Sequence, residues 1–101
     1  MEVNITKNDK VTTVEFVGRL DTPASPEVSA ALDPVIEEDA AGTIILDCSK
    51  MTYISSSGLR IFLTVRKAAA SKGGKVIVKG INTDIRNVFM MTGFLNLFEI
   101  Q

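Results

Sequence analysis

Short apolar segments that alternate with helical patterns are the feature that most constrains the fold of this 101-residue chain. Thr43 to Asp47 contains the continuous apolar run Ile44-Ile45-Leu46, and Val76-Ile77-Val78 is a second run of the same kind. A continuous apolar strand implies cover on both faces, as in a parallel or mixed central sheet. We therefore expect an α/β fold in which helices pack on such a sheet.

The N-terminal segment predicts a hairpin. Val3 and Ile5 alternate with polar residues, which is typical of a half-buried strand. Asn8-Asp9 favours a turn, because both side chains can bond the nearby backbone. Val11 to Val17 is rich in β-formers and predicts a second strand, which the chain leaves at Gly18.

The first helical pattern follows this hairpin. Thr22-Pro23 and Ser25-Pro26 are both suitable starts, with a capping hydroxyl and a proline in the first turn. Pro34 lies inside the pattern, lacks an N–H and predicts a kink or break near Asp33. Gly42 is a suitable stop signal before the next strand.

Two further helices are predicted in the C-terminal half. Ser55 to Ser57 precede the first of them, Gly73-Gly74 ends it, and the residues before it, Cys48 to Ile54, are interpreted as a loop. Thr83 is the expected cap of the last helix, which Gly93 ends. With a final strand over Leu97 to Ile100, the order becomes β-β-α-β-α-β-α-β. This order indicates a single mixed sheet of about five strands in one domain, 1–101.

Composition excludes several classes of function. The 11 basic and 12 acidic residues give a net charge of −1, so nothing indicates direct nucleic-acid binding. Without histidine there is no Ser-His-Asp triad and no histidine-ligated metal. Cys48 has no partner for an internal disulfide, and we interpret it as a buried, inert thiol of a reducing compartment. No phosphate-binding or dinucleotide motif is present, so we expect neither a cofactor nor an enzyme.

Localisation follows from the absence of apolar targeting segments. The N-terminus is polar, and no apolar run approaches the ~20 residues that span a bilayer. We therefore expect no membrane insertion and a cytoplasmic protein.

The segment Ser55-Ser56-Ser57-Gly58-Leu59 is the candidate site, because it joins a central strand to a helix N-terminus. Such loops lie at the carboxyl ends of strands, where ligands tend to bind, and a helix start stabilises a phosphate. The simpler interpretation is that the serines cap the helix and that Gly58 allows close packing. No side chain nearby can be assumed to deprotonate them, but a kinase brings its own base. Arg60, Arg66 and Lys67 on this helix are most simply scattered surface charge.

Short stretches in both halves of the chain form a set typical of one family: Gly18-Arg19-Leu20-Asp21, Asp47-Cys48-Ser49, Tyr53-Ile54, Ser56-Ser57-Gly58-Leu59, Lys72-Gly73-Gly74-Lys75, Val88-Phe89 and Met91-Thr92-Gly93-Phe94. In these stretches the chain resembles the STAS domain family, named for sulfate transporters and anti-sigma factor antagonists. The resemblance covers nearly the whole chain.

The resemblance implies a bacterial anti-sigma factor antagonist. Such a protein binds an anti-sigma factor that is a serine kinase, and thereby releases a sigma factor. By position, the kinase would phosphorylate Ser56, with Ser57 as second choice, and a metal-dependent serine phosphatase would reverse the modification. The implied partner-binding residues are Asp21, Ser55, Ser56, Ser57, Gly58 and Leu59.

Two departures from the family pattern keep an alternative open. Ser55 stands where the family often has Asp, and Arg19 stands where it usually has an acid. The alternative is a STAS domain that is never phosphorylated and serves as a scaffold subunit of a transport complex. A small enzyme or nucleotide-binding protein ranks last, since its motifs are absent.

Overall fold

The computed structural model describes all residues 1–101, and the order of its elements confirms the predicted one. Five strands and three α-helices are present, with one additional 3₁₀ turn. In chain order they are β1 (Glu2–Asn8), β2 (Val11–Leu20), α1 (Ser25–Glu38), β3 (Thr43–Ile54), α2 (Ser56–Ser71), β4 (Lys75–Lys79), α3 (Thr83–Thr92), the 3₁₀ turn η1 (Phe94–Asn96) and β5 (Glu99–Ile100).

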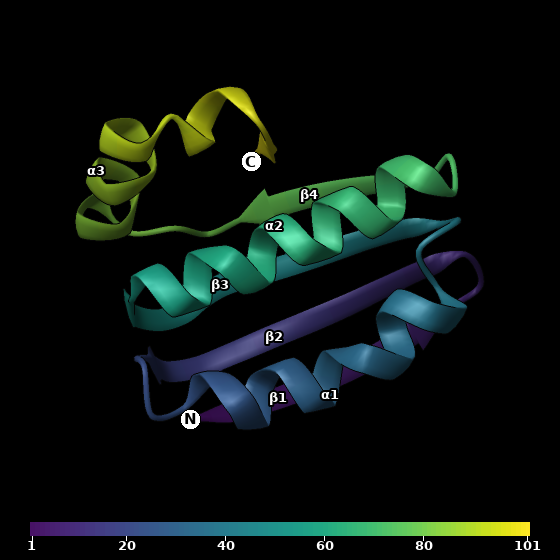
Figure 1. The fold of residues 1–101 in the computed structure, drawn as a ribbon, viewed down its shortest axis with the longest axis horizontal. Coiled ribbons are helices and arrows are strands. Elements are labelled where there is room, and N and C mark those ends of the chain that lie inside the picture. Colours follow the sequence, from purple (N-terminus) through teal and green to yellow (C-terminus); the bar gives the residue numbers. More distant parts are fainter.

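The sheet is mixed, as predicted, with the strand order β1-β2-β3-β4-β5. β1 and β2 are antiparallel, and all other neighbours are parallel. Because right-handed crossovers run in one direction along this order, they bring the helices to one face. Figure 1 shows α1 and α2 together on that face. The expected cover on both faces is therefore wrong for β3: Ile44 and Leu46 are fully buried beneath the helices, whereas Ile45 points the other way and is only half-buried. On β4, Ile77 is paired with Ile45 and is buried.

The largest difference between the predicted and the observed boundaries lies in β3. Cys48 to Ile54 is not a loop but the second half of this strand, paired with β2 up to Leu20. Register shifts between Glu15 and Val17 and between Gly18 and Arg19 disturb the pairing. Such bulges break the two-residue alternation that identifies a strand in a sequence. The bulges also explain why β2 continues past Gly18, where the sequence predicted that the strand ends.

The helix boundaries differ from the predictions in small ways. α1 begins at Ser25, but its N-cap is Ala24 and no side chain caps it. The helix continues through Pro34, so the predicted break is wrong. The cap of α3 is Asn82 rather than Thr83, with the Asn82 side chain accepting a hydrogen bond from the Ile85 N–H. β5 begins only at Glu99, because Leu97 and Phe98 form the turn after η1, with their N–H groups bonded to the Phe94 carbonyl.

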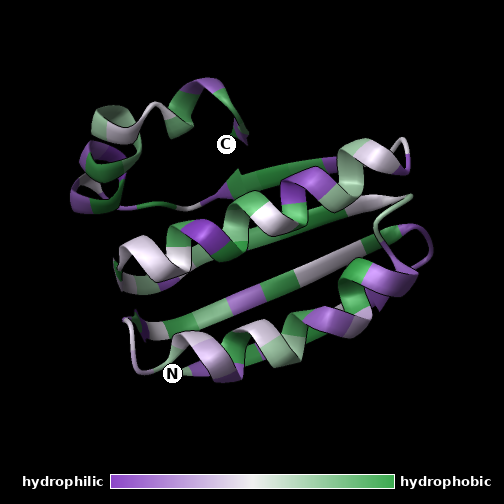
Figure 2. Ribbon diagram, viewed as in Figure 1, coloured by the Kyte–Doolittle hydropathy of each residue, from purple (hydrophilic) through white to green (hydrophobic).

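One hydrophobic core lies between the sheet and the helices. Figure 2 shows the hydrophobic colours concentrated along β3 and β4. Phe62 of α2 contacts both the sheet and α3: the centre of its ring lies 5.4 Å from that of Phe16 in β2 and 6.2 Å from that of Phe89 in α3. Such aromatic pairs add about 0.5–1.5 kcal/mol each beyond their buried area, so α2 is held firmly against the sheet. None of the helices combines the length and apolar character needed to cross a bilayer.

Candidate partner-binding site

The candidate site lies at the end of the molecule where the parallel strands β2 and β3 finish. α1 and α2 both begin at this end, as Figure 1 shows. A hydrogen bond of 2.8 Å from the Ser55 N–H to the Leu20 carbonyl joins the last residues of the two strands to the start of α2. The fold therefore brings Asp21, which follows Leu20, to the same end as the serine segment.

Ser55 is the structural member of the serine segment. It is buried, and its hydroxyl accepts a hydrogen bond from the Gly58 N–H at 3.2 Å as the N-cap of α2. Serine and aspartate are both good N-caps. Ser55 therefore caps the helix without placing a negative charge beside Ser56.

Ser56 is the first residue of α2 and is exposed to solvent, whereas the next serine, Ser57, is half-buried. The amides of both serines have no acceptor within the helix, because the first N–H groups of a helix lack intrahelical partners. The partial positive charge of a helix start favours an anion here. The Ser56 hydroxyl is thus accessible and lies in a setting that tolerates a phosphate.

Gly58 and Leu59 are buried beneath this surface. A Cβ on Gly58 would lie 2.7 Å from Leu20 Cγ and 2.9 Å from Ile54 Cγ1. The missing side chain therefore lets α2 pack closely on the ends of β2 and β3, which is the packing interpretation of this glycine. Among the residues of the motif, Ser56 presents the most accessible hydroxyl.

Asp21 is half-buried and partly engaged in local structure. One carboxylate oxygen accepts a hydrogen bond from the Ala24 N–H at 3.0 Å, and the Asp21 carbonyl accepts one from the Ser25 hydroxyl at 2.9 Å. These bonds shape the turn that leads into α1. Asp21 is therefore held at the rim of the site by the turn it stabilises.

Asp47 and Cys48 supply no base or nucleophile to the site. Burial alone would raise the pKa of Asp47, but hydrogen bonds from the Ser49 hydroxyl and N–H, with Lys79 and Lys50 nearby, hold it below its usual value. A carboxylate with a lowered pKa is a weak base. Cys48 is buried, as predicted, and burial, followed by the Asp47 charge, raises the pKa of its thiol to about 12, which disfavours the reactive thiolate.

A hollow beside the site was not predicted. It has a volume of about 230 Å³, and the Arg19 guanidinium at its edge lies 4.3 Å from the centre of the Tyr53 ring. Arg19 and Tyr53 are paired neighbours on β2 and β3, a contact that only the strand register creates. The hollow is lined by Arg19, Thr52, Tyr53, Ile54, Asp84, Ile85 and Val88.

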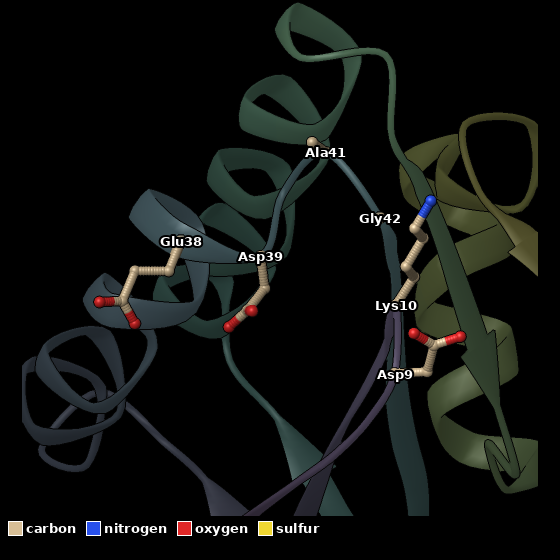
Figure 3. Close-up of a pocket in the computed structure, with 6 residues that line it drawn as sticks. All are labelled: Asp9, Lys10, Glu38, Asp39, Ala41 and Gly42. Carbon is tan, nitrogen blue, oxygen red and sulfur yellow. The ribbon is translucent and has the colours of Figure 1, made fainter.

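The largest hollow, about 320 Å³, lies at the opposite end of the molecule (Figure 3). Figure 3 shows Glu38 and Asp39 on one side of it and Asp9 and Lys10 on the other. Lys7 forms ion pairs of 3.0 Å with Asp39 and 3.6 Å with Glu38. The Glu38 and Asp39 charges are thus engaged within the chain, and the hollow lacks the apolar lining typical of a ligand pocket.

Comparison with known proteins defines the class. The family model of the STAS domain matches residues 2–101, so the chain belongs to the STAS domain family. The resemblance found in the sequence is therefore confirmed.

Particular relatives are anti-sigma factor antagonists by name. The anti-sigma-B factor antagonist of Staphylococcus aureus is 26% identical over 101 residues, which are 100% of this chain and 93% of that protein. The anti-sigma factor antagonist SpoIIAA in its unphosphorylated form is 19% identical, with a TM-score of 0.77 over 99% of this chain and 87% of that one. The phosphorylated form of SpoIIAA from Bacillus is 20% identical, with a TM-score of 0.77 over 99% of this chain and 91% of that one.

Proposed function

We propose that this protein is an anti-sigma factor antagonist whose binding is switched off by phosphorylation of Ser56. It would bind a serine-kinase anti-sigma factor in the bacterial cytoplasm, release a sigma factor, and be restored by a serine phosphatase. The observation that carries the proposal is the exposed Ser56 hydroxyl at the first position of α2, with its neighbours Ser55 and Gly58 buried beneath it. The chain itself would catalyse nothing.

The chemistry of the switch requires only an accessible hydroxyl on this chain. The kinase would transfer the γ-phosphoryl group of ATP to Ser56 Oγ, with its own base taking the hydroxyl proton and ADP leaving. The modification adds roughly −1.5 to −2 charges at neutral pH. At a docked surface this charge must be desolvated or must face the partner's acids, and either effect weakens association.

A switch of this kind needs no refolding. The start of α2 tolerates the added charge locally, because a helix N-terminus stabilises anions. The fold of this chain is similar to SpoIIAA in both its unphosphorylated and its phosphorylated form. These similarities support a change of surface charge on a constant fold.

Phosphorylation assays with matched serine variants test the proposal. The protein is incubated with ATP and a serine-kinase anti-sigma factor of the same organism, and the phosphate is mapped by mass spectrometry. We expect phosphate on the wild type and on Ser57→Ala, but none on Ser56→Ala. Ser56→Asp should weaken binding to the anti-sigma factor more than about tenfold, with little change in melting temperature. No phosphate on Ser55, Ser56 or Ser57, together with no binding to an anti-sigma factor, would overturn it.

The scaffold alternative rests on the missing acid at Ser55 and takes the serines as caps only, as Ser55 is for α2. In that case Ser56 would remain unmodified, and the chain would co-purify from cells with subunits of a transporter rather than with a kinase.

A further inference from the structure

The arginines of this chain differ in how their guanidinium groups are engaged. Arg19 stacks on Tyr53, and Arg66 donates a hydrogen bond from Nε to the Leu97 carbonyl at 2.7 Å. Arg60 is exposed, and its guanidinium takes part in none of the ion pairs or hydrogen bonds of the structure. The one side-chain hydrogen bond at this residue reaches its carbonyl, from the Thr64 hydroxyl at 3.0 Å. Arg60 thus has a free cationic group on the helix that begins at Ser56.

The spacing between Ser56 and Arg60 is that of neighbours on one helix face. Residues four apart lie one turn above each other. Side chains on a helix lean toward its N-terminus, so an arginine side chain at position 60 is long enough to reach the turn that contains Ser56. An anion on the N-terminal side of a cation is also the more favourable order for such a pair.

We propose that Arg60 is the intrahelical counter-ion of a phosphate on Ser56 and holds it against the first turn of α2. This inference rests on the proposed function, since it concerns the phosphorylated form of that site. Guanidinium and phosphate match in geometry and form paired, charge-assisted hydrogen bonds. The Ser56 and Ser57 amides supply further donors at the same place.

Few charges at this end compete for Arg60. α2 has no acidic residue in its first turn. Asp21, on the turn before α1, is bonded to the Ala24 N–H. Asp84 lies in the first turn of α3, on the hollow that Arg19 lines. Ser55, where an aspartate would repel the phosphate, is neutral.

The pairing fixes where the new charge is displayed. A phosphate held by Arg60 lies along the exposed side of the first turn of α2, over the surface proposed to meet the partner. The unmodified and modified forms would then differ in a positioned, partly neutralised charge. Arg60 acts through the phosphate and is a positioning residue.

The experiment installs phosphoserine at position 56 by genetic code expansion, so that neither a kinase nor a partner is required. Wild type and Arg60→Gln are compared, with Lys67→Gln as control, because Lys67 is an exposed cation of the same helix several turns away. The second pKa of the phosphate is measured by ³¹P NMR at low and at high salt. Melting temperatures are measured for each variant with serine and with phosphoserine.

We expect the second pKa of the phosphate to be lower by about 0.3 units in wild type and Lys67→Gln than in Arg60→Gln. Phosphorylation should raise the melting temperature by about 2 °C more in wild type than in Arg60→Gln. Both differences should shrink in high salt. Equal pKa values and equal melting shifts in wild type and Arg60→Gln would overturn the pairing. Failure of the proposed function would appear separately, as unchanged partner binding by the phosphoserine protein.

Discussion

The two ends of the sheet are built from the same strands and helices, but they leave different groups free. At the end shown in Figure 3, two cations are engaged around the end of α1: Lys7 pairs with Glu38 and Asp39, and the Lys72 ammonium donates to the Ile36 and Glu37 carbonyls at 3.1 and 2.9 Å. At the opposite end, the Ser56 hydroxyl and the Arg60 guanidinium are both exposed and unengaged.

The difference shows why the larger hollow is not the better candidate site. The C-terminal carbonyls of α1 attract cations, and the chain supplies those cations itself. The helix starts at the other end attract anions, and no acidic residue of this chain occupies the first turn of α2. A phosphate that a kinase transfers to this helix start would supply the missing negative charge.

Glycine substitutions should give the largest effects and should differ between the ends. A Cβ on Gly74 would overlap the Ala40 carbonyl oxygen, which is backbone and cannot move aside. We expect Gly74→Ala to lower the free energy of unfolding by about 3 kcal/mol. Gly58→Ala should cost less, about 1–2 kcal/mol, because it meets the Leu20 and Ile54 side chains and alanine is the better helix former.

Urea denaturation measures both variants. Gly73→Ala is a matched control, since nothing lies within 4 Å of its Cβ and only the positive φ of 75° opposes it. If Gly58→Ala were more destabilising than Gly74→Ala, the contrast between backbone contact at one end and side-chain contact at the other would be incorrect.

Adjacent serines should separate structure from switching at the Ser56 end. Ser55→Ala removes the cap of α2 and should lower the free energy of unfolding by about 1 kcal/mol. Ser56→Ala should change it by less than about 0.5 kcal/mol, because the side chain is exposed and bonds nothing. Thermal denaturation of the two variants measures both losses of stability. A larger loss for Ser56→Ala would mean that Ser56 is the cap.

The smallest expected effect concerns the ion pairs of Lys7, at the end of the molecule shown in Figure 3. A hydrogen bond to Asp39, together with the Asp39 and Glu38 charges, raises the pKa of Lys7 above its usual 10.5. A raised pKa means that the contribution of Lys7 to stability is complete below pH 10.5 and is lost as the pH rises through the shifted value.

We therefore expect Lys7→Gln to be slightly less stable than wild type near neutral pH, and the difference to vanish in strong alkali. Unfolding curves over a pH series measure this, with Lys10→Gln as control, since Lys10 forms no ion pair in the structure. A difference that persisted above the shifted pKa would show that Lys7 stabilises by packing instead.

Much of the fold was predictable because its signals are local. Gly93 ends α3 with a φ of 79°, a backbone conformation that glycine adopts without strain. A helix after the serine run was predicted from capping chemistry, which acts over three residues, but α2 begins at Ser56, so Ser56 and Ser57 lie within the helix rather than before it. The second half of β3 was missed, because bulges opposite β2 leave Cys48 to Ile54 without a two-residue alternation.

For the site, the sequence by itself determined the serine run, the helix start beneath it and the one-turn spacing of Ser56 and Arg60, because each depends on backbone geometry within a few residues. Only the tertiary structure decided that Ser55 is buried and Ser56 exposed, that Gly58 makes room for Leu20, and that Arg19 lies over Tyr53. These contacts join residues far apart in the chain, and they depend on strand register and on the face of the sheet that the helices cover, which no local pattern encodes.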